Sequence, residues 1–303
     1  MDPKQRDNYG NGSVDIEIDE ADLSSLGRRI LVRFSAPDYQ PPALPSVATK
    51  LLELSREPEV EFRRITEVLE QDQMLTGKVL ARAQSAAYAG SSPTRTLHDA
   101  LVRLGLGAIR NLVLEMAFHM TVFRASSYEK PMETLRIHSL MVAYAARLVA
   151  RQTAVDAEYA FLCGLLHDVG VSASLILLAA DPASKRPTVE QIWPALPWIH
   201  EDLSGQVVKL WKLPPEVAMV VGQHHRIHID GHPHPAIAVM RVAEGLAEEL
   251  GHGLTRPDLA GGHPFESTSP QELAQACAVL RLDGPARGRL LGALKALEPQ
   301  IVS

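Results

Sequence analysis

The segment Cys163-Gly-Leu-Leu-His167-Asp168-Val-Gly170 places an adjacent histidine and aspartate at the end of an apolar stretch. The stretch that leads into it, from residue 157, has helical character, and Gly170 is a typical stop signal. An adjacent His-Asp pair can supply one nitrogen and one oxygen ligand to a hard or borderline metal ion, and other helices can add ligands. The segment therefore predicts a helical fold built around a candidate metal site.

Apolar residues recur at helical spacing on both sides of this segment, from Ser46 onward. Residues 109–123 are almost entirely apolar, which indicates a helix buried in the middle of a bundle. No strand pattern is found after residue 45. Further helices are predicted over residues 135–150, 157–167, 199–210, 214–225, 235–250, 270–282 and 286–297. The fold class is therefore predicted to be all-α, as a two-part helical bundle.

The N-terminal region has a different pattern. Residues 1–13 are polar and rich in Gly and Asn, which predicts disorder. Apolar residues then alternate with polar ones in two stretches, Val14, Ile16 and Ile18, followed by Ile30, Val32 and Phe34. Period-two alternation is typical of strands, so the two stretches predict either a short β-hairpin or an extended linker.

Composition limits the class of protein. The chain has 303 residues, 46% of them hydrophobic, with 30 basic and 36 acidic residues and a net charge of −6. These values are typical of a globular protein and argue against a general binder of nucleic acids or anionic membranes. Cys163 and Cys277 lie in apolar contexts without partners at metal-ligand spacing, which favours a reducing compartment. No uninterrupted apolar run of about 18 residues is present, so we expect a cytoplasmic protein without a membrane span.

Imidazoles and carboxylates recur at inward-facing or helix-end positions of the second half of the chain. The set comprises His138, His167, Asp168, His200, His224, His225 and Glu244. A helical bundle can bring such side chains together into a mono- or di-metal centre, which would activate water for attack on a phosphate ester. The alternative is that each histidine is a hydrogen-bonded core residue. His228, His232 and His234 are predicted to lie in a solvated loop.

The order and spacing of five segments resemble the HDOD family, the HD-related output domain of bacterial signalling proteins. The resemblance covers roughly residues 40–250. The segments are LPSVATKLLEL, EVLEQDQMLTGKVLARAQSAAY, TLHDALVRLGLGAIRNLVL, RIHSLMVAYAARLVA and FLCGLLHDVG. The resemblance implies an N-terminal helical subdomain (41–130) joined to a subdomain like the HD-superfamily phosphohydrolases (131–255). Residues 1–40 would be an extension and residues 256–303 a helical tail.

The resemblance also implies a metal-ligand set. His138 and the pair His167-Asp168 match the first three ligand positions of the HD superfamily, and Glu244 stands where the superfamily has a later aspartate. The lysine common after the His-Asp pair is Val171 here, and the Gly-Tyr-Pro signature of the cyclic-dinucleotide phosphodiesterase branch is missing. The resemblance makes three further histidines candidates for a second metal site: His200, His224 and His225.

Two functions follow from this resemblance. The first is a non-catalytic signalling module that binds a protein partner, or a nucleotide such as a cyclic dinucleotide, through the groove between its helical halves. The second is a phosphohydrolase dependent on Fe, Mn, Mg or Zn, with His167 and Asp168 as catalytic candidates. The replacements at Glu244 and Val171 favour the first. DNA is not an expected partner, because the candidate recognition helix, residues 108–120, is almost wholly apolar with one Arg, whereas a major-groove helix needs several exposed polar side chains.

Overall fold

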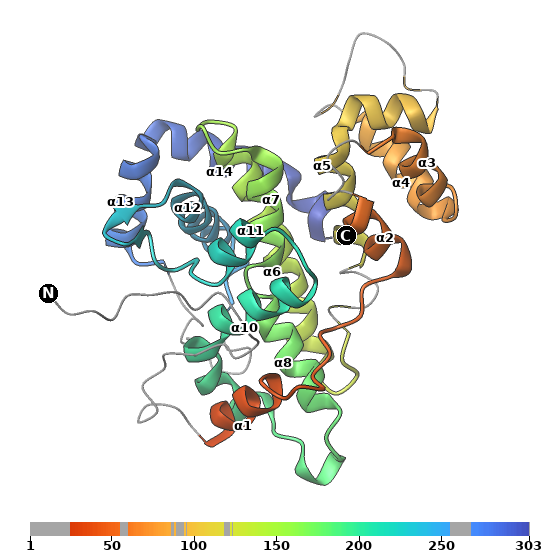
Figure 1. Ribbon diagram of the computed structural model, residues 1–303. Helices are drawn as coiled ribbons and strands as arrows, with labels where there is room; N and C mark the ends of the chain where they lie inside the picture. The colour runs from red at the N-terminus through yellow and green to blue at the C-terminus, as the bar shows by residue number, and fades with distance from the viewer. Residues whose placement is uncertain are drawn as a thin grey trace, which may run out of the picture.

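The protein is helical, and the predicted all-α class is confirmed (Figure 1). The computed structural model describes residues 25–54, 60–85, 88, 94, 96–117, 122, 124–254 and 268–302. Two hydrophobic cores divide the helices into a small lobe (α2–α5) and a large lobe (α1 and α6–α14). The metal-ligand candidates belong to the large lobe, and so do the C-terminal helices.

The small lobe consists of four helices: α2 (Ser46–Leu54), α3 (Phe62–Leu69), α4 (Gln73–Gln84) and α5 (Leu97–Ala117). Asp72 caps α4 by accepting a hydrogen bond from the backbone N–H of Leu75 at 3.0 Å. Helix α5 is kinked at Gly105, whose φ of 75° suits glycine. Beyond the kink, α5 packs against α7 and joins the two lobes.

The large lobe is built around α6, which packs against α7, α12 and α14. Its helices before the C-terminal pair are α6 (Glu129–Ala150), α7 (Ala157–Leu166), α8 (Val169–Ala179), α9 (Val189–Ile192), α10 (Leu196–Leu210), α11 (Pro215–Val221) and α12 (Pro235–Glu249). Short 3₁₀ turns, η3 (Ala183–Lys185) and η4 (Trp193–Ala195), flank α9. The side-by-side packing of α6 with α7 and α12 brings distant parts of the sequence together at one site.

A run of 23 residues in this lobe, Ala157–Ala179, is long and apolar enough to cross a membrane by length and composition alone. Its apolar window is 89% buried within the protein. The helix is interrupted there at His167-Asp168, between α7 and α8. The run is therefore a core segment of the helical bundle.

The strand predicted at Ile30, Val32 and Phe34 is wrong, because these residues lie in helix α1 (Ser25–Phe34). Ile30 and Phe34 are buried against the large lobe, whereas Val32 is 70% exposed. Residues four apart share a helix face, so the burial follows helical spacing rather than strand alternation. The other half of the predicted hairpin and the predicted disordered residues 1–13 lie outside the described residues.

One small β element was not predicted. Strand β1 (His228–Ile229) pairs antiparallel with β2 (His232–Pro233). Asp230 and Gly231 between them have φ values of 50° and 78°. Positive φ at both turn positions is the hallmark of an Asp-Gly hairpin turn, a signal that the sequence does contain.

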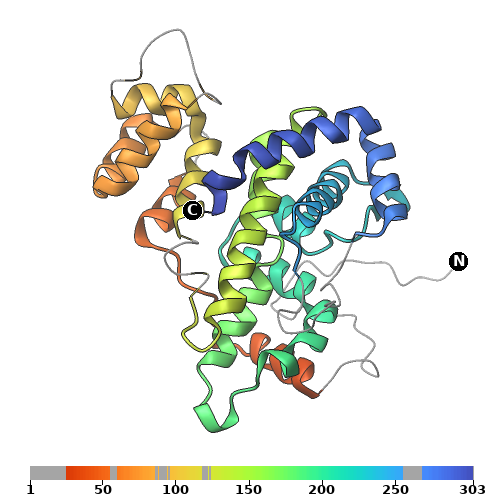
Figure 2. The ribbon, with the colours of Figure 1, turned by 180° about the vertical axis from the view of Figure 1, so that it is seen from behind.

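The C-terminal pair of helices, α13 (Pro270–Leu280) and α14 (Gly284–Val302), agrees with the prediction of two helices there. Helix α13 packs on α12, and α14 packs on α6 and α12. Figure 2 shows α14 crossing the large lobe toward the small lobe, where the chain ends. Both helices thus cover the elements that carry the candidate site.

Candidate metal centre

Five helical elements deliver the predicted ligands to one buried point in the large lobe. His138 comes from α6, His167-Asp168 from the junction of α7 and α8, and His200 from α10. His224 and His225 follow the end of α11, and Glu244 lies on α12. All of these side chains are buried except His225, which is partly buried. The structure therefore brings together all seven residues that the sequence singled out, although their role as ligands stays a prediction.

His138, His167 and Asp168 form the tightest part of this cluster. The Nε2 atoms of the two histidines are 3.1 Å apart. Asp168 Oδ2 lies 3.5 Å from His138 Nε2 and 3.2 Å from His167 Nε2. Three potential ligand atoms, one from α6 and two from the α7/α8 junction, thus point at a common centre.

The other ring nitrogens determine what the two Nε2 atoms present. His138 Nδ1 lies 2.7 Å from the carbonyl oxygen of His252, and His167 Nδ1 lies 2.8 Å from that of Gly164. Because a carbonyl only accepts, each Nδ1 must donate, and in a neutral ring the Nε2 is then an acceptor. Two acceptors facing each other at 3.1 Å need a cation between them, either a proton or a metal ion. A backbone carbonyl behind each imidazole is also the usual support of a metal-bound histidine.

A second group of acceptors lies beside the first. His224 Nδ1 donates to the carbonyl of Val221 at 2.8 Å. His224 Nε2 lies 3.7 Å from Asp168 Oδ1 and 3.9 Å from Glu244 Oε1. These three buried atoms have no hydrogen-bond partner within the described part of the chain. Since a buried polar atom without a partner is costly, this arrangement fits an ion as the missing partner.

His200 and His225 form a third part of the cluster. His200 Nδ1 faces the carbonyls of Leu196 and Pro197 at 3.1 and 3.2 Å. Its Nε2 lies 3.1 Å from His225 Nε2 and 3.7 Å from Asp168 Oδ1. His225 Nδ1 contacts the guanidinium of Arg241.

The electrostatics favour a cation at the centre. Burial and the neighbouring His167 lower the pKa of His138 to about 4. Burial together with His167 and His200 holds the pKa of His224 well below its usual range. Burial alone would lower the pKa of His167. The carboxylates of Asp168 and Glu244 outweigh burial and raise this pKa to about 9. His138 and His224 are thus neutral acceptors at pH 7, while positive charge is stabilised between His167 and Asp168.

The two carboxylates behave differently. Burial disfavours the charge of Asp168, but His167, His200 and His224 outweigh it and hold the Asp168 pKa well below its usual range. Burial raises the pKa of Glu244 to about 7, although Arg241 opposes the shift. Arg241 also donates to Glu244 Oε2 at 2.5 Å, so Oε1 is the oxygen that faces His224. The glutamate at the position of the later aspartate therefore does reach the cluster.

The space at the centre is small. Its lining includes Glu248 and Leu254 besides the ligand candidates, and the described residues leave a cavity of about 20 Å³. A cavity needs roughly 10–15 Å³ to hold one water molecule. The cavity therefore has the size of a metal ion or a water molecule.

Sequence reasoning missed Arg241 and His252. Arg241 is 2% exposed and interrupts the apolar run of α12, and a charged residue in such a run is a detectable signal of a buried polar network. His252 acts through its backbone carbonyl, for which no sequence signal exists. His228 and His232 are exposed and His234 is partly buried; none of them joins the described cluster, as predicted for the loop.

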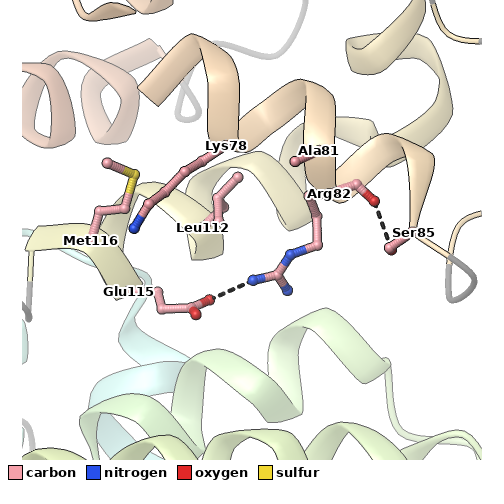
Figure 3. Close-up of a pocket in the computed structure, with 7 residues that line it drawn as sticks. All are labelled: Lys78, Ala81, Arg82, Ser85, Leu112, Glu115 and Met116. Carbon is pink, nitrogen blue, oxygen red and sulfur yellow. Dashed lines mark hydrogen bonds and ion pairs between the residues drawn. The ribbon is translucent and has the colours of Figure 1, made fainter. Parts of the chain in front are cut away.

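A separate cavity of about 280 Å³ lies between α4 and α5, where the small lobe meets α6 (Figure 3). Arg82 donates to Glu115 Oε2 and to Tyr144 Oη, both at 2.9 Å. Because Glu115 neutralises Arg82, Lys78 supplies the remaining positive charge of the lining. None of the candidate metal ligands lines this cavity.

Comparison with known proteins gives a family and a fold. The HDOD domain matches residues 42–227. A protein from Treponema pallidum (strain Nichols) named "Uncharacterized protein" is 24% identical over 197 residues, which are 61% of this chain and 38% of that protein. The chain thus spans well under half the length of this curated relative.

Three solved structures share the fold. One, from Shewanella amazonensis SB2B, is provisionally described as a metal-dependent phosphohydrolase and has a TM-score of 0.67 at 21% identity, covering 91% of this chain and 100% of that chain. An HDOD domain protein with unknown function from Geobacter sulfurreducens has a TM-score of 0.60 at 20% identity, covering 92% and 95%. A Marinobacter aquaeolei VT8 protein, provisionally described as a signal transduction protein, has a TM-score of 0.60 at 21% identity, covering 95% and 66%.

Proposed function

Because the chain belongs to the HDOD domain family, we propose that it is a signal-transduction output module whose large lobe binds a divalent metal ion in a non-catalytic site. The observation that carries the metal proposal is the convergence of acceptor atoms. His138 Nε2, His167 Nε2 and Asp168 Oδ2 meet within 3.5 Å of one another, and a backbone carbonyl supports each imidazole. Imidazole and carboxylate together suit Fe, Mn or Zn better than Mg, which prefers oxygen ligands.

A bound divalent ion in such a site supplies positive charge that can polarise a phosphate or lower the pKa of water. The chain's own residues favour a structural use of that charge. The cavity of about 20 Å³ has the size of an ion or a water molecule, and Val171 stands where a lysine would contribute charge. His138 of α6, the His167-Asp168 junction and Glu244 of α12 would hold the ion, and its charge would stabilise the packing of these elements.

We expect the signalling partner of this chain to be a protein. The Marinobacter aquaeolei relative, with the same fold, is provisionally described as a signal transduction protein, and this chain covers 66% of it. The cavity between α4 and α5 (Figure 3) would bind an anionic nucleotide only weakly, because Glu115 neutralises Arg82. The observations therefore favour a protein partner over a cyclic dinucleotide.

The metal proposal is tested by mass spectrometry of tag-free protein after reconstitution with Mn²⁺, Fe²⁺ or Zn²⁺ and dialysis. We expect bound metal in the wild type and its loss in the His167→Ala/Asp168→Ala double variant. A His232→Ala/His234→Ala variant is the matched control, since it removes two loop histidines outside the cluster. Absence of metal in the reconstituted wild type would contradict the proposal.

A metal-dependent phosphohydrolase is the second candidate. The observation in its favour is the set of potential metal ligands. This set includes Asp168 Oδ1, His224 Nε2 and Glu244 Oε1, which have no hydrogen-bond partner among the described residues. The test is hydrolysis of cyclic dinucleotides, nucleotides and an aryl phosphodiester with added Mn²⁺, Fe²⁺ or Mg²⁺. Turnover by the wild type that the double variant lacks would replace the non-catalytic proposal with this one.

A further inference from the structure

Arg241 is a buried cation at the edge of the candidate metal centre. Its Nη1 donates to Glu244 Oε2 and contacts His225 Nδ1, and its Nη2 donates to Glu272 Oε2 of α13 at 3.2 Å. Glu272 is itself fixed, because the same oxygen accepts from the backbone N–H of Ser269 at 2.9 Å. The guanidinium is therefore held in place between two carboxylates.

The contact with Arg241 determines the hydrogen-bond direction of His225. A guanidinium carries only donors, so His225 Nδ1 must accept, and the proton of the neutral ring is then on Nε2. That proton points at His200 Nε2, 3.1 Å away. His200 Nε2 is an acceptor, because His200 Nδ1 donates to the carbonyls of Leu196 and Pro197. A continuous chain of donors and acceptors thus runs from Arg241 through His225 to His200.

The adjacent histidine has the opposite arrangement. His224 Nδ1 donates to the carbonyl of Val221, so His224 Nε2 presents an acceptor to Asp168 and Glu244. For His225 Nε2 to bind a metal, its proton would have to move to Nδ1, where it would face a donor N–H of Arg241. Two buried donors facing each other are unfavourable, so Arg241 opposes that exchange.

We infer that Arg241 makes His225 a hydrogen-bond donor to His200 and thereby limits the centre to a single metal ion, with His224 but not His225 as a ligand. His225 and Arg241 are then positioning residues. His200, His224 and His225 are close enough to be grouped as a second site, but their hydrogen-bond directions disfavour it. This inference rests on the proposed metal binding.

The adjacent pair offers a matched test. Tag-free protein is titrated with Mn²⁺, and unbound Mn²⁺ is counted by electron paramagnetic resonance. We expect one equivalent in the wild type. His224→Ala should weaken binding by about tenfold or more, whereas His225→Ala should keep one equivalent with a clearly smaller loss of affinity, because His225 forms its hydrogen bonds with His200 and Arg241. Thermal melting with and without Mn²⁺ checks that each variant is folded.

Arg241→Met tests the cause. Without the guanidinium, His225 can place its proton on Nδ1, and we expect a second equivalent of Mn²⁺ to bind. Arg287→Met is the control, because Arg287 also joins a glutamate of α12, Glu249, to the C-terminal helices but lies outside the cluster. It should retain one equivalent.

The outcomes separate this inference from the proposed function. Two equivalents in the wild type, equal losses in His224→Ala and His225→Ala, or one equivalent in Arg241→Met would overturn the inference and leave metal binding intact. A wild type that binds no Mn²⁺, Fe²⁺ or Zn²⁺ would overturn the proposed function and the inference with it.

Discussion

Glu158 on α7 is one residue at which polar contacts join the two lobes. It accepts from Tyr88 Oη at 2.9 Å and from Asn111 Nδ2 at 2.9 Å, and it pairs with Arg147 of α6 at 2.8 Å. Tyr88 and Asn111 belong to the small-lobe side of the junction, whereas Arg147 belongs to the large lobe. A single carboxylate thus connects the lobes through three partners.

Glu158→Gln should lower the free energy of unfolding at pH 7 by about 1.5–3 kcal/mol, the range for hydrogen bonds to a charged group. Burial would raise the Glu158 pKa, but Arg147, Tyr88 and Asn111 outweigh it, so the net pKa lies below 4.5. A lowered folded-state pKa stabilises the protein above the unfolded-state value near 4.5, and this contribution is lost as the pH falls further. The difference between wild type and variant should therefore shrink below about pH 4.5.

Urea unfolding followed by circular dichroism at several pH values measures this difference. The control is Glu67→Gln, which breaks the exposed pair of Glu67 with Arg63 on α3. Exposed pairs contribute about 0–1 kcal/mol, so this variant should stay near wild type at all pH values. A difference for Glu158→Gln that does not change with pH would contradict the electrostatic explanation.

At the scale of elements, close helix packing positions the His-Asp pair. Gly170 on α8 lies against α10, and a Cβ added there would be 2.5 Å from Ser204 N and 2.7 Å from His200 O. The Gly170 N–H also donates to Ser204 Oγ at 2.8 Å. The absence of a side chain at Gly170 therefore determines how near His200 comes to Asp168.

Gly170→Ala should destabilise the protein by about 1–3 kcal/mol, since the added methyl group meets backbone that cannot move cheaply. It should also weaken metal binding by displacing α10. Gly292→Ala on α14 is the matched control, because nothing lies within 4 Å of a Cβ added there. That variant should be stabilised by about 0.5–1 kcal/mol. Thermal unfolding of both variants checks the pair, and equal effects would refute the packing argument.

At the scale of the whole molecule, the C-terminal helices complete the large lobe although they lie outside the matched residues 42–227. Glu298 of α14 contacts His252 Nε2 at 2.7 Å, and the His252 carbonyl accepts from His138. Glu272 of α13 holds Arg241. Both helices thus reach the candidate centre through one intermediate residue each.

Leu294→Ala should lower the free energy of unfolding by about 2–5 kcal/mol, because Leu294 is completely buried in the large-lobe core. If α14 is an integral part of that core, tryptophan fluorescence should report one shifted urea transition, since all three tryptophans lie in the large lobe. Lys295→Ala, at the exposed neighbouring position, should change stability by less than about 0.5 kcal/mol. An unshifted tryptophan transition in Leu294→Ala would show that α14 is dispensable.

The sequence alone determined the features that depend on local periodicity and local hydrogen bonds. Helical spacing predicted the helices after residue 45 and the inward positions of the ligand candidates. A local hydrogen bond of this kind caps α5, where Thr96 Oγ1 accepts from the backbone N–H of Asp99 at 3.0 Å. The strand prediction failed at Ile30, Val32 and Phe34. Ile30 and Phe34 are four residues apart, so they also fit one buried face of a helix.

Only the tertiary structure decided which atoms of His138 and His225 donate and which accept. The directions of His138 and His225 depend on groups distant in sequence, the His252 carbonyl and the Arg241 guanidinium, whereas His167, His200 and His224 are oriented by carbonyls three or four residues before them. The sequence could propose that His224 and His225 act alike, since they are adjacent. Their opposite roles arise because His224 finds a local acceptor, the Val221 carbonyl, whereas only tertiary packing brings the buried cation Arg241 to His225.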